Sequence, residues 1–163
     1  MLKQLTNAIR RNHALEHATI SILLNRLGRQ IRIIGRAAPD GFYIYADVPT
    51  EKIRDSAKEG LARLQRGESH LAVSPLCGTN IAVAGVLAGL ASFLALGTSN
   101  RFERLPNVLT ATMLAVVAAQ PLGRLAQKHL TTSPDLDGVE IVSVQPMGKR
   151  LLNLHKVKTA FNA

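Results

Sequence analysis

Two long stretches without a charged side chain constrain this sequence more than any other feature. No Asp, Glu, Lys, Arg or His occurs over the thirty residues from Leu71 to Asn100, or over the nineteen from Leu105 to Gly123. A helix needs about 20 apolar residues to cross the hydrocarbon core of a bilayer. Buried helices of soluble proteins rarely lack charge for so long. The pattern therefore predicts two transmembrane helices, over 79–96 and 106–130, joined as a hairpin.

The basic residues are distributed unevenly around these stretches. Of the twenty Lys and Arg residues, twelve precede Cys77 and six follow Gly123, and only Arg101 and Arg104 lie between the two helices. Because cytoplasmic segments of membrane proteins are rich in Lys and Arg, we expect a multi-pass protein of the inner (cell) membrane with both termini cytoplasmic. The formal charge of +9 then fits contact with the lipid bilayer and its anionic headgroups. Without Trp or an aromatic–basic motif, nucleic acid is not an expected partner.

The segments on either side of the hairpin predict a mixed α+β domain. Apolar residues at steps of three and four indicate a helix over 2–27, and a second helix runs from Thr50, its expected N-cap, to about Gly67. Five short strands are expected over 30–34, 42–48, 70–73, 139–144 and 151–160. The fold class is therefore an α+β membrane protein with a two-helix transmembrane hairpin (78–130). Its small cytoplasmic domain of two helices and about five strands is formed by both chain ends (1–77 and 131–163).

Small residues are frequent in the predicted hairpin. Gly85 and Gly89 form a GxxxG pair, and Ala111, Ala115 and Ala119 recur at steps of four in the second helix. Such residues let helices approach closely, so we expect tight packing within the hairpin, and a homo-oligomer is also compatible with the pattern.

The run from His13 to His17 carries the clearest chemical signal. It reads His-Ala-Leu-Glu-His in the middle of the first predicted helix. Histidines four residues apart project from one face of a helix and can share a metal ion. Glu16, one residue before the second histidine, could then act as the catalytic base toward a water on that ion. The alternative is a pair of hydrogen-bonded core histidines with Glu16 as their acceptor.

A catalytic zinc site needs three protein ligands and one open position. Cys77 is the first choice for the third ligand, because it is the only thiol and lies in a polar bend before the first transmembrane helix. His70 is the second choice, followed by Glu68, His155 and His129. The alternative for Cys77 is a small apolar residue at a helix start.

Two motifs taken together carry a resemblance to a known family. With His13-Ala14-Leu15-Glu16-His17 and Cys77-Gly78-Thr79-Asn80, the chain resembles a small bacterial membrane family of unknown function. The HxxEH motif alone is similar to that of the inverted-motif zinc peptidases, such as the pitrilysin group. That resemblance implies zinc ligation by His13 and His17, with Glu16 as base. Those enzymes take their third ligand from a downstream glutamate, for which this chain offers no clear match.

The function that the sequence favours is that of a membrane-associated zinc-dependent hydrolase. Its expected substrates are peptides near the cytoplasmic membrane surface. Two alternatives remain at this stage. One is a membrane assembly factor or complex subunit without enzymatic activity, and the other is a closed structural or sensing metal site.

Overall fold

The chain is divided into two compact units. The computed structural model describes residues 2–28, 31–97, 103–147 and 153–161. One unit comprises Met1–Ser74 and Lys128–Ala163, here called the sheet unit, and the other comprises Pro75–Gln127, here called the hairpin unit. Each is described by itself below.

The described residues of the sheet unit form two α-helices and four strands. The helices are α1 (Leu2–Leu27) and α2 (Thr50–Gln65), with a short 3₁₀ helix, η1 (Ser69–Ala72), and a π-helical turn, η2 (Gln127–Thr131), at its border with the hairpin unit. The strands are β1 (Ile33–Ala38), β2 (Gly41–Ala46), β3 (Val139–Pro146) and β4 (Leu154–Phe161). They form one antiparallel sheet in the order β1-β2-β4-β3. Strands from both chain ends therefore share one sheet.

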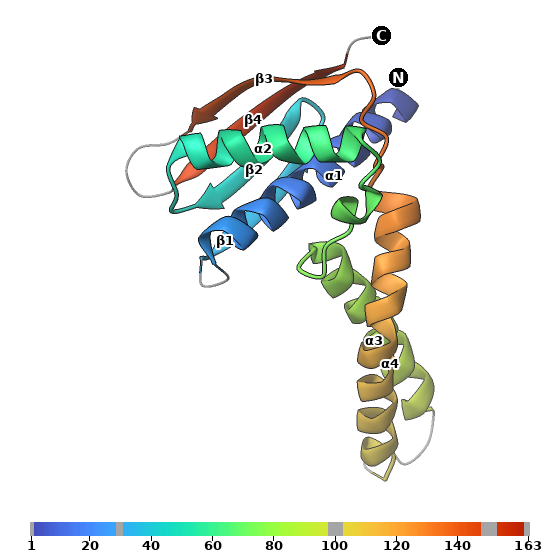
Figure 1. The fold of residues 1–163 in the computed structure, drawn as a ribbon. Coiled ribbons are helices and arrows are strands. Elements are labelled where there is room, and N and C mark those ends of the chain that lie inside the picture. Colours follow the sequence, from blue (N-terminus) through green and yellow to red (C-terminus); the bar gives the residue numbers. More distant parts are fainter. Residues whose placement is uncertain (1, 29–30, 98–102, 148–152, 162–163) are drawn as a thin grey trace. The chain divides into compact units, whose positions relative to one another are not determined.

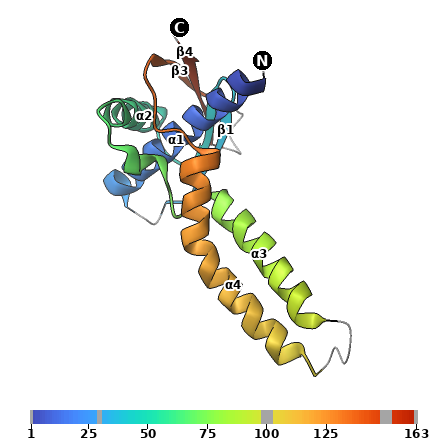
Figure 2. The same cartoon turned by 90° about the vertical axis from the view of Figure 1, so that its right-hand side faces the viewer.

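Both helices lie on the same face of the sheet (Figure 1 and Figure 2). Helix α1 packs on β1 and β2, and α2 packs on β3 and β4. The core between these layers is apolar: Leu15 of α1, Phe42 and Ile44 of β2, Ile53 of α2 and Val157 of β4 are all fully buried. The alternation of side chains along β2 explains this arrangement, since every second residue points toward the helices.

Three sequence predictions for this unit were wrong in detail. Residues 70–73, expected as a strand, belong to η1, because Leu71 and Ala72 are buried in succession and the Leu71 amide donates to the Glu68 carbonyl. The described residues therefore form four strands, not five. The N-cap of α2 is Pro49, and the Thr50 hydroxyl instead contacts Nδ1 of His155 at 3.3 Å.

The strand bounds also differ from prediction by a few residues. Strands β1 and β2 were expected over 30–34 and 42–48 and span 33–38 and 41–46. Strand β4 was expected from 151 and begins at 154; residues 30 and 151–152 lie outside the described part of the chain.

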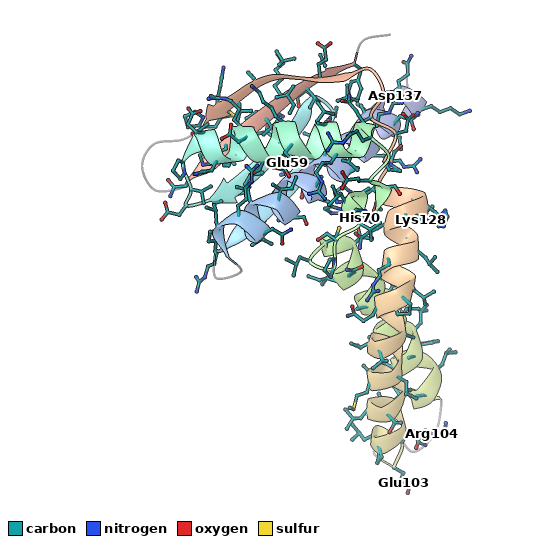
Figure 3. All side chains as sticks on the ribbon, viewed as in Figure 1. Glu59, His70, Glu103, Arg104, Lys128 and Asp137 are labelled. Atoms are coloured by element: carbon teal, nitrogen blue, oxygen red, sulfur yellow. The ribbon has the colours of Figure 1, made fainter. Side chains whose placement is uncertain are left out.

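The hairpin unit consists of two antiparallel helices, α3 (Gly78–Leu96) and α4 (Leu105–Ala126). Each is long and apolar enough to cross a membrane, α4 being counted together with η2. Large apolar side chains cover their outward surfaces, including Phe93 (77% exposed) and Leu94 (76% exposed). Figure 3 shows the charged residues Glu103 and Arg104 at the loop end of this hairpin. A soluble core helix would have these apolar surfaces buried.

The contact between α3 and α4 does not involve the two glycines of the GxxxG pair. Added Cβ atoms at Gly85 and Gly89 would meet nothing within 4 Å, so these glycines do not line the contact between α3 and α4. The close approach occurs instead at Gly123, where a Cβ would lie 2.3 Å from Oδ1 of Asn80. Farther along, the Ser92 and Thr112 hydroxyls are hydrogen-bonded at 2.7 Å.

One buried side chain joins three parts of the sheet unit. The Asn12 amide of α1, fully buried, donates to the carbonyls of Ala38 (2.8 Å) and Pro39 (3.1 Å) in the β1–β2 turn. Its Oδ1 accepts a 2.7 Å hydrogen bond from the hydroxyl of Thr159 in β4. Asn12 therefore fixes the position of α1 along the sheet.

We expect Asn12→Ala to lower the free energy of unfolding of the sheet unit by about 2–3 kcal/mol, because buried carbonyls and a hydroxyl lose their partners. Chemical denaturation of the full chain in detergent measures this change. Asn7→Ala, at an exposed position of the same helix, is the control and should change stability by less than about 0.5 kcal/mol. Equal effects of the two substitutions would contradict this role of Asn12.

Candidate metal centre

His13 and His17 lie one turn apart on α1 and face the same way. Their ring centroids are 4.4 Å apart and the ring planes are inclined by 59°. His17 is buried, with 3% of its surface exposed, and His13 is half-buried. The helix predicted from the apolar periodicity thus brings the two imidazoles together.

Each imidazole is oriented by a backbone carbonyl. Nδ1 of His13 lies 2.9 Å from the Thr131 carbonyl oxygen, and Nδ1 of His17 lies 2.8 Å from the Ala72 carbonyl oxygen. A carbonyl oxygen can only accept, so in both rings Nδ1 carries the hydrogen and donates it. In the neutral rings Nε2 then holds a lone pair. Metal-binding histidines are commonly oriented in this way, through the nitrogen that does not bind the metal.

Among the described residues, the buried Nε2 atom of His17 has no hydrogen-bond partner, and neither has Nε2 of His155. An unsatisfied buried polar atom costs free energy, and such atoms are rare in folded proteins. A metal ion would satisfy this lone pair. The observation favours ligation over the alternative of a fully hydrogen-bonded core histidine pair.

Two arginines hold the segment that orients His13. Nη2 of Arg10 donates to the carbonyls of His129 (3.1 Å) and Thr132 (3.0 Å), on both sides of Thr131. Next to it, Arg11 forms a 2.7 Å ion pair with Asp135. Its guanidinium lowers the pKa of the Asp135 carboxyl by hydrogen bonding, so the pair persists at neutral pH. The carbonyl of Thr131 is therefore fixed relative to α1.

The Glu16 side chain packs against β1 at Gly35. A Cβ atom at Gly35 would lie 2.1 Å from Oε1 and 2.5 Å from Cδ of Glu16. Glu16 is only 5% exposed. The absence of a side chain at Gly35 is therefore what leaves room for the buried carboxylate, one turn along α1 from His13.

Within the hairpin unit, the motif Cys77-Gly78-Thr79-Asn80 begins α3. Cys77 is its N-cap, and Sγ accepts from the Thr79 amide at 3.4 Å. The Asn80 side chain donates to the Pro75 carbonyl (3.0 Å) and accepts from Gln127 (2.7 Å). Amide N–H groups at a helix start stabilise a thiolate, the form of cysteine that binds metals. His13 and His17 of the sheet unit and Cys77 of the hairpin unit can each offer one ligand atom to a metal ion.

The other predicted ligands have different surroundings. His70 is exposed on η1 (Figure 3), and His129 is exposed on η2. Glu68 pairs with Arg63 at 2.6 Å, which lowers the pKa of its carboxyl, and His155 faces Thr50. In the described part of the chain, none of these four joins His13 and His17 in a group of potential metal ligands.

Three contributions to the site were missed by sequence reasoning. Gly35 carried a detectable signal, since a glycine inside a strand often marks a close approach of another group. The carbonyls of Ala72 and Thr131 carried none, because backbone groups have no sequence signature and both come from segments far from His17 and His13 in the chain.

Comparisons with known proteins identify relatives but no activity. The family described as a domain of unknown function, DUF6391, matches residues 8–144. An uncharacterized protein of Picosynechococcus sp. (strain PCC 7002) is 34% identical over 139 residues, which cover 79% of this chain and 68% of that protein. No solved structure matches the chain.

The contact between Gly35 and Glu16 predicts a coupling between the two positions. Gly35→Ala should destabilise the sheet unit by about 1–3 kcal/mol, because its Cβ displaces a buried carboxylate. In a Glu16→Ala background the same substitution should cost less than about 0.5 kcal/mol, since the obstructing atoms are gone. Denaturation of the four proteins of this double-mutant cycle measures both values. Additive effects would show that Gly35 does not accommodate Glu16.

Proposed function

The chain belongs to the DUF6391 family, and we propose that it is a membrane-associated zinc-dependent hydrolase whose metal ligands are His13, His17 and Cys77 and whose catalytic base is Glu16. The substrates proposed are peptide segments close to the cytoplasmic membrane surface. The observation that carries the proposal is the orientation of the two imidazoles, together with the buried Nε2 of His17, which has no hydrogen-bond partner among the described residues.

The membrane placement is supported by the hairpin unit. Its two helices have the length and composition to span a bilayer, and most of their surface is apolar and exposed. The excess of Lys and Arg outside the hairpin supports cytoplasmic termini. The sheet unit would then lie in the cytoplasm, attached to the membrane at Ser74 and Lys128.

Cys77 is proposed as the third ligand on grounds of chain reach and chemistry. Ala72, whose carbonyl holds His17, precedes it by five residues, which can extend over about 17 Å at most. The thiol lies at the start of α3, where the Thr79 amide supports the thiolate. His70, the second choice from the sequence, is exposed and is not proposed as a ligand, because in the described part of the chain it joins no group of potential metal ligands with the two histidines. Two imidazoles and one thiolate are donors that favour zinc.

Glu16 is proposed as the base because of its place in the motif, one residue before His17. It lies on the α1 turn that follows His13, and its side chain packs against β1 at Gly35. Zinc at this site would lower the pKa of a coordinated water toward neutrality. Glu16 could then accept the proton of that water as it attacks a peptide carbonyl, and return it to the leaving amine.

A metal site without catalysis is the second candidate. It is favoured by one specific observation within the sheet unit, the low exposure of His17 (3%) and Glu16 (5%). A closed structural or sensing site has four protein ligands and admits no substrate. A membrane module without metal would be a third outcome of the experiment below.

We expect the purified full chain to contain about one zinc ion per molecule, measured by elemental analysis of protein expressed in zinc-supplemented medium. His17→Ala should lose most of this zinc because it removes a ligand. Glu16→Gln should keep the zinc but lower the hydrolysis of a peptide library by about 10²–10⁴-fold, because the base is lost.

His129→Ala is the matched control, since it removes an exposed histidine near the same segment and should change neither zinc content nor hydrolysis. Zinc that persists without any hydrolysis, in the wild type as in Glu16→Gln, would select the closed metal site. Folded wild-type protein with no zinc would overturn the proposal and leave a non-enzymatic membrane module.

A further inference from the structure

One face of the sheet is not covered by α1 or α2. The strand register shows which side chains share it, because directly paired residues of antiparallel strands point to the same side. Arg36 pairs with Tyr43, and Tyr43 with Lys156. Ile34 pairs with Tyr45 in the adjacent row. We call this surface the open sheet face and define it by Ile34, Arg36, Tyr43, Tyr45, Lys156 and Lys158.

The open sheet face is basic. Arg36 and Lys158 are both exposed, and neither forms an ion pair among the described residues. Lys156, largely buried, has its charge compensated by Asp40 at 2.7 Å. Of the acidic residues near this face, Asp40 is thus paired, Glu140 lies opposite Ala160, and Asp47, just after β2, accepts a hydrogen bond from the Asn153 amide at 2.7 Å. A positive surface of this kind is complementary to an anionic partner.

The same face also presents apolar and amphipathic groups. Ile34, between the exposed Arg32 and Arg36, is itself 68% exposed. The rings of Tyr43 and Tyr45 are half-buried in the sheet. An exposed aliphatic side chain flanked by arginines and tyrosines suits the interface of a bilayer, where apolar groups enter and basic groups meet lipid phosphates.

We infer that the open sheet face docks on the surface of an anionic lipid bilayer, with Arg36 and Lys158 contacting headgroups and Ile34 entering the interface. This inference rests on the membrane placement in the proposed function, and not on the metal site. The chain leaves the sheet unit at Ser74 and enters it again at Lys128, and the hairpin unit lies between them. A bilayer spanned by the hairpin would be at high effective concentration around the sheet unit.

A single-stranded nucleic acid is the competing partner, because basic sheet faces with aromatic residues also bind unpaired bases. Here the geometry favours lipid. The Nζ atom of Lys156 lies 4.0 Å from the centroid of the Tyr43 ring and covers one face of it. The ring is therefore not free to stack with a base on that side. Ile34, the most exposed apolar residue of this face, offers no stacking surface either.

A single tryptophan tests the inference, since the chain has none. Ile34→Trp places the tryptophan at an exposed position of the open sheet face. This variant of the whole chain is reconstituted in phosphatidylcholine vesicles with or without about 30% phosphatidylglycerol. In the anionic vesicles we expect the tryptophan emission to shift to shorter wavelength and to be quenched by brominated lipid. In the same background, the double substitution Arg36→Gln with Lys158→Gln should weaken docking about 30-fold. Each cation near an anionic membrane surface contributes about 1 kcal/mol of binding free energy, and two are removed.

Lys52→Gln with Lys58→Gln removes the same charge from exposed positions on α2 and should leave the emission shift intact. An equal loss in this control, or a shift that does not depend on anionic lipid, would overturn the inference. Quenching by an added oligonucleotide in place of lipid would assign the face to nucleic acid. Release of the protein by alkaline carbonate would refute the membrane placement itself. A retained protein with a water-exposed tryptophan would refute only the docking.

Discussion

Two hydrogen bonds from imidazole nitrogens to backbone carbonyls determine what the α1 motif can do. They fix both rings of His13 and His17 in the form that carries hydrogen on Nδ1. Without them the rings could rotate or change tautomer, and the HxxEH pattern would be a sequence coincidence. With them, Nε2 is the ring nitrogen that can bind an ion, and among the described residues the buried Nε2 of His17 has no hydrogen-bond partner. The metal proposal depends on this arrangement more than on the motif.

The fold supplies these carbonyls from both segments that border the hairpin unit. Ala72 lies just before it in the chain and Thr131 just after it. Arg10 and Arg11 hold the second of these segments on α1, and Asn12 fixes α1 on the sheet. Four consecutive residues of one helix turn, 10 to 13, therefore act together to position the site. This arrangement concentrates polar groups in the core, where the Asn12 amide and Nη2 of Arg10 donate to backbone carbonyls.

Much of the fold follows from patterns in the sequence, and the site follows only in part. The 3.6-residue periodicity of α1 and α2 and the alternation of β3 predicted their elements, because each has one face in a common core. The segment from Ser69 to Ala72 was misassigned since four residues are too few to distinguish a strand from a 3₁₀ turn. His13, Glu16 and His17 were recognisable from spacing alone. The partners of these residues were not, because Gly35 and the two carbonyls are brought to α1 only by tertiary packing.

X-ray absorption spectroscopy of the zinc-loaded protein tests the central claim most directly, since it reports the atoms bound to the metal. Our account predicts two nitrogen ligands of imidazole type at about 2.0–2.1 Å, one sulfur at about 2.3 Å, and a light fourth ligand from water. Cys77→Ser should remove the sulfur contribution and leave the imidazole signals. A shell of oxygen ligands without imidazole nitrogens would contradict the account, because it would show that His13 and His17 do not bind the ion.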